Sequence, residues 1–448
     1  MITNVNKRVV VLGMGVSGLS AAAYCLRKEW EVTVVDNRQE PPLLSEFKKN
    51  FENLNIVLGS FLEVDFKLFD LVVISPGLDP HSDELQTMRD SGVEVVGDIE
   101  LFIREVSVPI VAITGSNGKS TVCDLLGHTL NRLGINTIVA GNIGAPVLDL
   151  LNISMPQLFV LELSSFQLET TRSLRANVAC VLNISPDHLD RHITMDRYAA
   201  IKFSIFDNAK TAIINVDENF VNKLDNYKSC ERLISFGRSD DANWRAVLSE
   251  NEYQVSNEHG VIIRESDVSI QGMHNGLNIA ATIAILQGLE IAIDSQVVDA
   301  ISSYKGLRHR CELVPSDDGI RWINDSKATN PGAAIAAIES FSNSMGHLLL
   351  IAGGDAKGCD LSELAAVINE KVHSVAIFGK DKYRIANELV KEKCTLVDNL
   401  DQAVELIRVN AKKGDTVLLA PACASIDMYK NYEARGEHFR NLVGGVNV

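Results

Sequence analysis

Short, uninterrupted apolar runs recur along the chain, and stretches with helical periodicity separate them. In the first part of the chain these runs lie at Lys7–Leu12, Glu31–Val35 and Leu71–Ile74, and turn residues bound them. Runs of this length and composition are typical of strands that are buried on both faces of a parallel sheet. The pattern therefore predicts βαβ connections in a doubly wound sheet, which closes near Gly97.

The same alternation continues in two further units. The second unit opens with the strand Pro109–Ile113, and the third begins near Gly306. Further strands are predicted at Thr137–Ala140, Leu158–Leu161, Val178–Leu182, Ala212–Asn215, Leu348–Ile351, Val375–Phe378 and Thr416–Leu419. Residues 240–270 are polar and irregular, which suggests a short antiparallel excursion. We expect an α/β fold of three consecutive domains: a Rossmann-like domain at 1–97, a P-loop ATPase-like domain with a mainly parallel sheet at 98–306, and a second Rossmann-like domain at 307–448.

Composition narrows the class of protein. Of the 448 residues, 46% are hydrophobic and 22% are charged, so the chain can bury several cores. The formal net charge of -16 is spread along the chain and would repel a phosphate backbone, so no nucleic-acid partner is expected. The 8 cysteines show neither a CxxC pair nor zinc-ligand spacing, which indicates reduced thiols and a cytoplasmic setting.

Residues Val9–Leu26 carry no charge and follow Lys7-Arg8, as in a signal peptide. Glycines and serines interrupt this run, so we expect a buried strand, a turn and a helix there. No other stretch is long and apolar enough for a bilayer, and no membrane insertion is expected. We further expect a monomer.

The most specific motif is Gly115-Ser-Asn-Gly118-Lys119-Ser120, which lies between a predicted strand and a predicted helix. Backbone N–H groups and the helix N-terminus can bind phosphates there, and Lys119 can reach the terminal phosphates. Ser120 or Thr121 can face Mg²⁺. Ile113 stands where the full Walker pattern has its first glycine. We favour ATP binding over an ordinary glycine-rich turn.

A second glycine motif, Gly13-x-Gly15-x-x-Gly18, is followed by Asp36 and matches the dinucleotide fingerprint. By itself the match is weak, because a tight turn that packs a helix on a strand has the same glycines. We therefore expect a nucleotide of some kind rather than NAD in particular.

Polar side chains follow several predicted strands at their carboxyl ends, where ligand sites of α/β proteins lie. Glu162 and Asp187-His188 do so in the second unit and could hold Mg²⁺ near the glycine-rich loop. Three loops do so in the third unit and could form one rim: Asp325–Asn330, Gly353–Gly358 and Ala422–Ser425. The alternative in each case is ordinary turn chemistry. Lys202 lies in a predicted helix, and the residue pattern alone favours a solvated lysine.

In their order along the chain, these motifs resemble those of the Mur ligases, and the match covers essentially the whole chain. The matching segments are Thr114–Thr121, Gly141–Gly144, Glu162–Leu168, Asn183–Asp190, His274-Asn275, His309-Arg310, Asp325–Asn330 and Pro421–Gly436. Within the family, the Gly13–Gly18 unit and the run Ser425–Tyr432 resemble the members that add D-glutamate. The Asp-Asn-Pro-Arg signature of the diaminopimelate- or lysine-adding members is absent.

The resemblance implies an activity and a set of residues. It implies an ATP-dependent ligase of peptidoglycan synthesis that joins D-glutamate to UDP-N-acetylmuramoyl-L-alanine through an acyl phosphate. Implied ATP contacts are Gly115, Ser116, Asn117, Gly118, Lys119, Ser120, Thr121, Asn278, Arg310 and Asp325. Implied contacts of the UDP substrate are Val16, Ser17, Asn37, Ser75, Asn142, Ser164 and Gln167. Implied D-glutamate contacts are Thr329, Lys357, Ser425 and Tyr432, with Lys327 beside them.

The resemblance also implies the catalytic set Lys119, Glu162, His188, Lys202 and Lys327. Two Mg²⁺ ions would be held by Ser120, Glu162, His188 and Lys202, and Lys202 would carry a CO₂-derived carbamate. This implication reverses the solvated interpretation of Lys202, because a carbamate is an oxygen ligand of the kind that Mg²⁺ prefers. The alternatives are another ligase of the superfamily such as a folylpolyglutamate synthase, a nucleotide-binding dehydrogenase with an accessory ATPase, and a non-catalytic nucleotide sensor. Domain closure is expected, with a hinge near Gly306.

Overall fold

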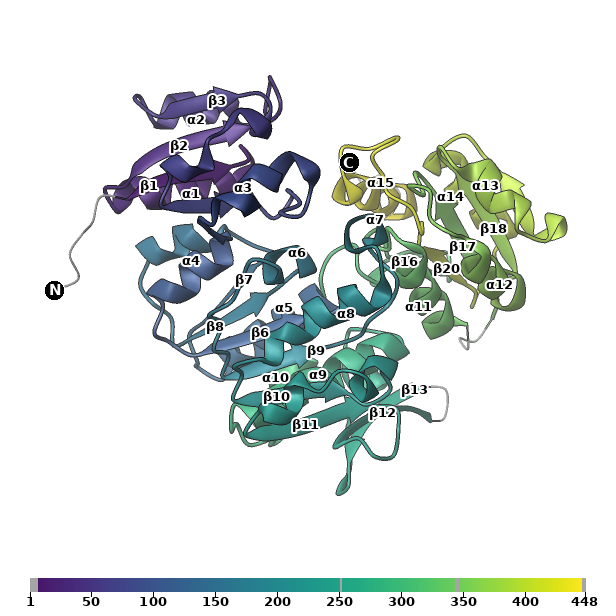
Figure 1. Cartoon of the computed structure of the whole chain (residues 1–448). Helices are drawn as coiled ribbons and strands as arrows, with labels where there is room; N and C mark the ends of the chain where they lie inside the picture. Colours follow the sequence, from purple (N-terminus) through teal and green to yellow (C-terminus); the bar gives the residue numbers. More distant parts are fainter. Residues whose placement is uncertain (1–6, 250–251, 343–345, 445–448) are drawn as a thin grey trace.

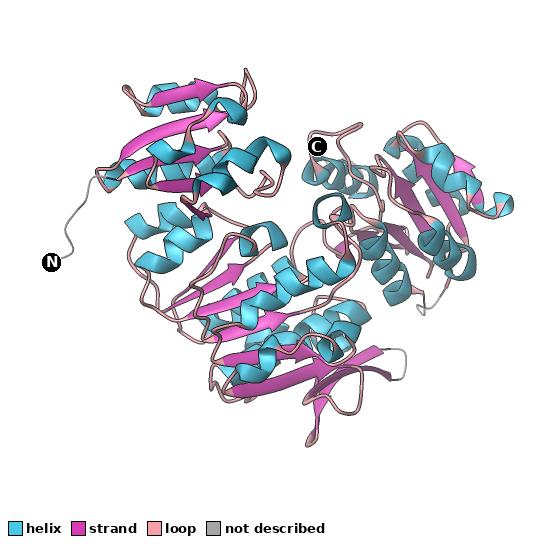
Figure 2. Ribbon diagram, viewed as in Figure 1, coloured by secondary structure: helices cyan, strands magenta, loops and turns pink. Residues whose placement is uncertain are grey.

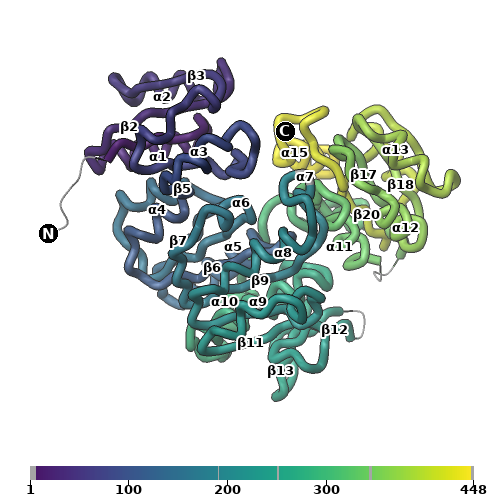
Figure 3. Tube along the Cα trace, viewed as in Figure 1, coloured from purple at the N-terminus to yellow at the C-terminus, as the bar shows by residue number. Residues whose placement is uncertain are grey.

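Three sheets, one in each of three consecutive α/β units, form the framework of the molecule (Figure 1). The computed structural model describes residues 7–249, 252–342 and 346–444. Strands and helices alternate in each unit (Figure 2), and the chain leaves each unit before it builds the next (Figure 3). The expected fold class, α/β with mainly parallel sheets, is confirmed.

The first sheet has 5 parallel strands in the order β3-β2-β1-β4-β5. Its strands are β1 (Arg8–Leu12), β2 (Glu31–Asp36), β3 (Asn55–Leu58), β4 (Leu71–Ile74) and β5 (Glu94–Val96), and its helices are α1 (Val16–Arg27), α2 (Leu44–Asn50) and α3 (Gln86–Ser91). Gly18 lets α1 pack against the preceding turn, because a Cβ atom there would lie 1.9 Å from the Gly13 carbonyl oxygen.

The second sheet has 9 strands in the order β14-β13-β12-β11-β10-β9-β6-β8-β7. Its strands are β6 (Ile110–Thr114), β7 (Thr137–Gly141), β8 (Leu158–Glu162), β9 (Val178–Val181), β10 (Thr211–Asn215), β11 (Arg232–Gly237), β12 (Trp244–Ser249), β13 (Glu252–Asn257) and β14 (Gly260–Arg264). Its helices are α4 (Asp98–Glu105), α5 (Lys119–Arg132), α6 (Ser165–Leu168), α7 (Leu189–His192), α8 (Met195–Phe203), α9 (Met273–Gly288) and α10 (Ser295–Ser302). The antiparallel excursion is confirmed as β12–β14. Because β6 pairs with both β8 and β9, the carboxyl ends of those strands flank the loop that follows β6.

The third sheet has 6 strands in the order β15-β16-β20-β17-β18-β19, and only the β15–β16 pair is antiparallel. Its strands are β15 (Glu312–Val314), β16 (Arg321–Asn324), β17 (Leu348–Gly353), β18 (Ser374–Phe378), β19 (Cys394–Leu396) and β20 (Thr416–Leu419). Its helices are α11 (Pro331–Phe341), α12 (Ser362–Lys371), α13 (Lys382–Asn387), α14 (Leu400–Asn410) and α15 (Tyr432–Gly444). The Asn330 side chain caps α11 by accepting from the Ala333 N–H group.

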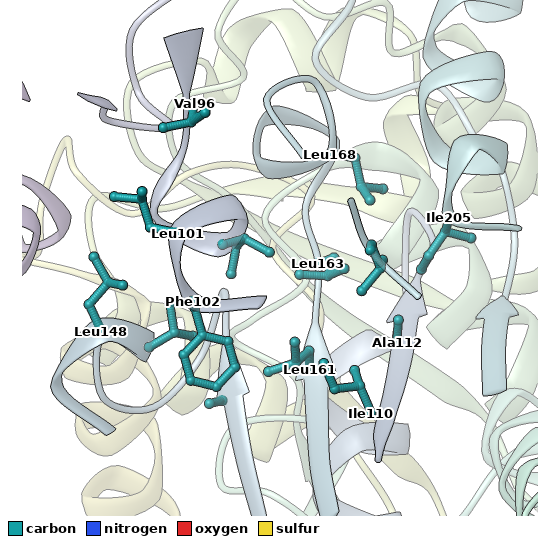
Figure 4. Close-up of a cluster of buried hydrophobic side chains, with 14 of the residues drawn as sticks. Val96, Leu101, Phe102, Ile110, Ala112, Leu148, Leu161, Leu163, Leu168 and Ile205 are labelled. Carbon is teal, nitrogen blue, oxygen red and sulfur yellow. The ribbon is translucent and has the colours of Figure 1, made fainter. Parts of the chain in front are cut away.

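One continuous apolar core joins the first two units. It extends from Val9 of β1 to Ile214 of β10. At its middle, Phe102 of α4 packs edge to face on Phe159 of β8 with ring centroids 5.0 Å apart, and Figure 4 shows Phe102 between Leu148 and Leu161. The two apolar clusters of the third unit contain only residues of that unit. The third unit can therefore move without breaking a core that it shares with the other two.

Candidate active site

The loop after β6 turns directly into α5. Its last residue, Gly118, is the N-cap of α5 with φ +82°, and a Cβ atom there would lie 2.6 Å from Asn278 Oδ1. Asn278, on α9, therefore lies against the loop, and its contact with ATP stays a prediction. Lys119 Nζ donates to the carbonyl oxygens of Gly115 and Ser116 at 2.8 and 2.9 Å. The loop, its lysine and the helix N-terminus have the arrangement that binds phosphate groups.

The segment after β9 holds this loop in place. The Ser116 N–H donates to the Asn183 carbonyl oxygen at 2.9 Å, and the Asn117 N–H donates to Asn183 Oδ1 at 2.8 Å. Asn183 Nδ2 donates back to the Asn117 carbonyl oxygen at 3.0 Å, and the Ser116 hydroxyl donates to the Ser185 carbonyl oxygen at the same distance. Asn183 was not among the predicted site residues, although its place at the carboxyl end of a strand was an available signal.

Glu162 ends β8 with its side chain 1% exposed. Its Oε1 atom accepts from Asn142 Nδ2 at 2.9 Å, whereas its buried Oε2 atom has no hydrogen-bond partner in the described part of the chain. A buried carboxylate oxygen without a donor is costly unless a cation completes it. The residues therefore fit a bound cation at Glu162.

Lys202 lies on α8 with 2% exposure, so the solvated interpretation of this lysine is wrong. Its Nζ atom donates to the Gly115 carbonyl oxygen at 2.9 Å and to the Thr114 hydroxyl at 3.3 Å, and it lies over the Tyr198 ring, 4.8 Å from the centroid. Burial, and then the charge of Lys119, lowers the pKa of Lys202 well below that of a free lysine. The alternation of apolar residues on α8 did not predict this burial, because tertiary packing against the loop produces it.

His188 differs from these groups because its side chain is 48% exposed. Its backbone has φ +52°, and its ring lies 4.8 Å from that of Phe166. In residues 7–249, 252–342 and 346–444, no group of three or more His, Cys, Asp or Glu side chains is arranged to hold a metal ion. The ligand set thus stays a prediction: Ser120, Glu162, His188 and Lys202. Only Glu162 and His188 of this set belong to the four residue types His, Cys, Asp and Glu.

The third unit reaches the loop through Arg310. Its Nη2 atom donates to the Ser120 hydroxyl at 2.9 Å. Next to it, the Cys311 N–H donates to the Asp325 carboxylate at 3.3 Å, and burial raises the pKa of Asp325 to about 6. The predicted ATP contacts Arg310 and Asp325 thus lie together, and Arg310 touches the loop itself.

The predicted D-glutamate residues lie on adjacent loops of the third unit. Lys327 Nζ lies 4.4 Å from the centroid of the Tyr432 ring, and burial, then Arg310, lowers the pKa of Lys327. Asp355 pairs with Ala424 in an antiparallel bridge, which brings the loops of Lys357 and Ser425 together. Ser425 is buried, Thr329 is half-buried and Lys357 is exposed.

Arg435 of α15, which the sequence did not single out, joins these loops. It is fully buried, and it donates to the Ser326 hydroxyl and to the carbonyl oxygens of Ser326, Gly353 and Cys423. Burial lowers its pKa to about 10, so the guanidinium stays charged at neutral pH. One side chain thus holds together the three loops that were predicted to form a rim.

In the first unit, the predicted contacts of the UDP substrate surround the Gly13 turn. The Ser75 hydroxyl donates to the Gly13 carbonyl oxygen at 3.4 Å, Val16 is 62% exposed, and Asn37 Nδ2 donates to Glu84 at 3.1 Å. Ser17 lies beside the buried carboxylate of Asp98 and acts to lower its pKa, which burial raises. At this turn Val16 is accessible, whereas Gly13 and Met14 are buried.

Asp36 is not available to a ligand as the dinucleotide fingerprint would require. It is 1% exposed, and its carboxylate accepts from the Met14 N–H at 2.7 Å and from the Arg38 guanidinium at 2.8 and 2.7 Å. Burial acts to raise the pKa of Asp36, but the hydrogen bonds from Arg38 and Met14 outweigh it and lower that pKa. An engaged Asp36 argues against ribose recognition of the NAD type and hence against the dehydrogenase alternative.

The remaining predicted contacts of the UDP substrate lie beside Glu162. The Asn142 N–H donates to the Glu162 carbonyl oxygen at 2.8 Å. Ser164 and Gln167 form a capping box at the start of α6, in which the Ser164 hydroxyl accepts from the Gln167 N–H. Their side chains therefore already have a structural role. Across the described residues, no helix is both long and apolar enough to span a bilayer.

Three family models match consecutive parts of the chain. A Mur ligase MurD-like N-terminal domain matches residues 7–97, a Mur ligase middle domain matches residues 113–286, and a Mur ligase glutamate ligase domain matches residues 309–423. The match over residues 7–97 covers the unit that we would not expect in a folylpolyglutamate synthase.

Full-length relatives are found among curated proteins. The UDP-N-acetylmuramoylalanine–D-glutamate ligase of Haemophilus influenzae (strain ATCC 51907 / DSM 11121 / KW20 / Rd) is 40% identical over 437 residues, which is 98% of this chain and 98% of that protein. The enzyme of the same name from Idiomarina loihiensis is 40% identical over 458 residues, which is 99% of this chain and 97% of that protein.

Solved structures share the fold at low identity. The MurF ligase from Thermotoga maritima in complex with ADP has a TM-score of 0.64 at 18% identity and covers 99% of this chain and 98% of its own. The UDP-N-acetylmuramate-alanine ligase MurC from the same organism has a TM-score of 0.60 at 16% identity, with coverages of 97% and 98%.

Proposed function

This chain belongs to the Mur ligase family, and from that premise we propose that it is an ATP-dependent ligase of peptidoglycan synthesis that joins D-glutamate to UDP-N-acetylmuramoyl-L-alanine. One observation carries the proposal above the others: the 40% identity to D-glutamate ligases extends over 98% of the chain. Lys119 and the buried residues Lys202 and Glu162 at the glycine-rich loop support it, because they suit the transfer of a phosphoryl group.

The reaction would have two steps. The carboxylate of UDP-N-acetylmuramoyl-L-alanine attacks the γ-phosphorus of ATP, the bond to the β-phosphate oxygen breaks, and ADP leaves. The amine of D-glutamate then attacks the acyl carbon, a C–N bond forms, the C–O bond to the phosphoryl group breaks, and phosphate leaves while the amine loses a proton to solvent. Lys119 and the backbone N–H groups of the loop bind the phosphates and offset the negative charge that builds up.

Mg²⁺ fits the unpartnered oxygen of Glu162, and we propose that Ser120, Glu162, His188 and a carbamate on Lys202 hold two such ions. The ions would supply charge neutralisation between the anionic substrates. The carbamate would form by addition of the neutral Lys202 amine to CO₂ with loss of one proton. The lowered pKa of Lys202 supports this proposal, because it makes the neutral amine accessible.

D-glutamate would bind at the third unit and the UDP substrate at the first and second units. Lys327, Thr329, Lys357, Ser425 and Tyr432 would bind D-glutamate, and Arg310, Asp325 and Asn278 would bind ATP beside the loop. The UDP substrate would contact Val16, Ser17, Asn37, Ser75, Asn142, Ser164 and Gln167. We propose domain limits at 97/98 and 306/307 and a monomer. We also propose a cytoplasmic location, because all 8 cysteines are free thiols.

The test is ADP release by the purified chain with ATP, Mg²⁺ and UDP-N-acetylmuramoyl-L-alanine. We expect release only when D-glutamate is also present, together with the mass increase of one glutamyl residue on the UDP-linked substrate. Equal ADP release with L-alanine or diaminopimelate in place of D-glutamate would refute the choice of amino acid. Binding of ATP with no product in any combination would favour the non-catalytic sensor.

A further inference from the structure

The segment that connects the second and third units, residues 303–310, lies along one face of α5. Ser120, Asp124 and His128 of α5 follow each other at four-residue intervals and so share that face. Each contacts the connecting segment. Arg310 Nη2 donates to the Ser120 hydroxyl at 2.9 Å, the Tyr304 hydroxyl donates to Asp124 Oδ2 at 2.7 Å, and His128 Nε2 lies 2.8 Å from the Ser303 hydroxyl oxygen.

The segment changes partners between Tyr304 and Arg308. Arg308 pairs with Glu437 of α15 at 2.6 Å, and the Lys327 N–H donates to the His309 carbonyl oxygen at 3.1 Å, so the backbone from Arg308 onward belongs to the third unit. Residues 305–307 lie between the two sets of contacts, and Gly306 in their middle has φ +83°. Among the described residues, the backbone of 305–307 makes no hydrogen bond, and the one side-chain hydrogen bond of this stretch runs from Lys305 Nζ to the Ser269 hydroxyl at 3.4 Å. We therefore expect rotation between the units to occur here.

Tyr304 is suited to hold the upstream end of this stretch. It is 4% exposed, and burial, together with Asp124, raises its pKa, so its phenol stays protonated and donates throughout the range in which proteins are folded. Hydrogen bonds to a charged acceptor are about twice as strong as neutral ones.

We propose that Tyr304 and Asp124 are positioning residues for the ATP site: their hydrogen bond fixes the upstream end of the 305–307 hinge on α5, so that Arg310 returns to Ser120 at the phosphate loop. The inference rests on the proposed function, in which Arg310 and Ser120 contact ATP. Without this bond, the upstream end of the hinge is held only by the contact of Ser303 with His128, so Tyr304 joins the free tether. A longer tether lowers the effective concentration of Arg310 at the loop.

Tyr304→Phe tests the proposal with little risk to folding. The cavity beside the pair has a volume of about 480 Å³ and is lined by Asp124, His128 and Tyr304 among others, so water can solvate Asp124 when the hydroxyl is gone. Tyr24→Phe is the matched control. Tyr24 is also 4% exposed and also donates to a carboxylate at 2.7 Å, that of Glu105, but it lies far along the chain from the hinge.

Two measurements are made on the full-length enzyme: steady-state kinetics with each substrate varied, and amide hydrogen exchange of residues 302–312. For Tyr304→Phe we expect kcat/KM for ATP to fall about tenfold, KM for UDP-N-acetylmuramoyl-L-alanine to change less than twofold, and exchange in 302–312 to accelerate. Tyr24→Phe should leave all three at the wild-type values. Asp124→Ala should match Tyr304→Phe, and the double variant should lose less than a further twofold.

Faster exchange with unchanged ATP kinetics would show that the bond is only structural and would overturn the positioning role. Unchanged exchange, or multiplicative losses in the double variant, would overturn the pairing of Tyr304 with Asp124. If the wild-type chain releases no ADP with the two proposed substrates, the proposed function fails, and the exchange data together with the affinity for ATP by calorimetry still decide whether the pair positions the site.

Discussion

Lys119 and Lys202 donate to the same carbonyl oxygen, that of Gly115, at 2.8 and 2.9 Å. Lys202 is buried and Lys119 is half-buried, and two ammonium groups at one acceptor repel each other, so one of them is favoured in its neutral form. Burial lowers the pKa of both, and for Lys202 the charge of Lys119 lowers it further. A neutral Lys202 amine is the form that can add to CO₂.

Replacement of Lys202 by alanine tests this chemistry. We expect Lys202→Ala to lose about 100-fold or more in kcat, because the proposed carbamate oxygens are removed from the site. Acetate or formate should restore part of the activity by occupying the space of the carbamate. The readout is ADP release at increasing concentrations of the short carboxylate.

Lys210→Ala serves as the control, since Lys210 is an exposed lysine shortly after the same helix. It should retain wild-type activity and show no response to acetate. Full activity of Lys202→Ala would remove Lys202 from the catalytic set, and loss without rescue by any small carboxylate would leave the ammonium, rather than a carbamate, as the active form.

Glu162→Gln tests the cation site. The amide keeps the shape of the side chain but removes the charge next to the unpartnered Oε2 atom. We expect the Mg²⁺ concentration for half-maximal activity to rise at least tenfold and kcat to fall by about two orders of magnitude. The measurement is a magnesium titration of ADP release at saturating ATP.

The control for this variant is Glu100→Gln, because Glu100 is also 1% exposed but its carboxylate binds the N–H groups of Arg172 and Ser173. Glu100→Gln should lower stability and leave the magnesium dependence unchanged. An unchanged magnesium dependence in Glu162→Gln would mean that the ion binds elsewhere.

Local pattern was sufficient for the fold and for the glycine-rich loop. Apolar runs such as Val9–Leu12 are buried on both faces, and a turn that needs positive φ at Gly118 needs glycine, so both features can be read from a few consecutive residues. The carboxyl ends of β8 and β9 flank the loop because of the strand order, which is why Glu162 could be anticipated.

Features that depend on distant packing could not be anticipated in this way. Lys202 stands on a helix whose own residues suggest solvent, and only its contact with Gly115 reveals its burial. Tyr304 meets Asp124 across 180 positions of sequence, and Asp36 accepts from the Met14 N–H across 22 positions although its motif suggests a free carboxylate. Such contacts follow from tertiary structure and leave no local pattern.

Asp325 gives the enzyme a predicted pH dependence of stability. Burial raises its pKa from 3.8 to about 6 in the folded chain, so between these values the native state binds more protons than the unfolded state. Stability from this group is therefore fully present below pH 3.8 and is lost as the pH rises through 6. We expect Asp325→Asn to gain about 2 to 3 kcal/mol relative to the wild type between pH 4 and pH 7.

The measurement is urea-induced unfolding of both proteins without nucleotide at pH 4 and pH 7. Asparagine can still accept from the Cys311 N–H, so the comparison isolates the charge. Asp415 provides the opposite case: burial acts to raise its pKa, but hydrogen bonds from the N–H groups of His347 and Lys412 lower it below 3.8. Its contribution to stability is therefore lost only as the pH falls below 3.8, and the difference between Asp415→Asn and the wild type should be nearly the same at pH 4 and pH 7. A constant difference between Asp325→Asn and the wild type at the two pH values would contradict a raised pKa.

Arg435 should matter most at the D-glutamate end of the site. Its guanidinium joins the carbonyl oxygens of Ser326, Gly353 and Cys423, and the loops that contain them carry the proposed D-glutamate contacts. Arg435→Met removes these donors and leaves buried carbonyl groups unpaired, at a cost of about 1 to 3 kcal/mol each.

We therefore expect Arg435→Met to raise KM for D-glutamate more than tenfold, while KM for UDP-N-acetylmuramoyl-L-alanine changes little, and Arg435→Lys to recover part of the loss through one donor group. Arg408→Met is the control, because Arg408 also donates to backbone carbonyl oxygens, those of Leu442 and Val443. These lie at the C-terminal end of α15, whereas the predicted D-glutamate contact Tyr432 is its first residue. Both variants should lose stability, and only Arg435→Met should change the dependence on D-glutamate. Equal KM values for D-glutamate in the two variants would reduce Arg435 to a general stabiliser of the third unit, since a residue that positions the loops must alter the affinity of what the loops bind.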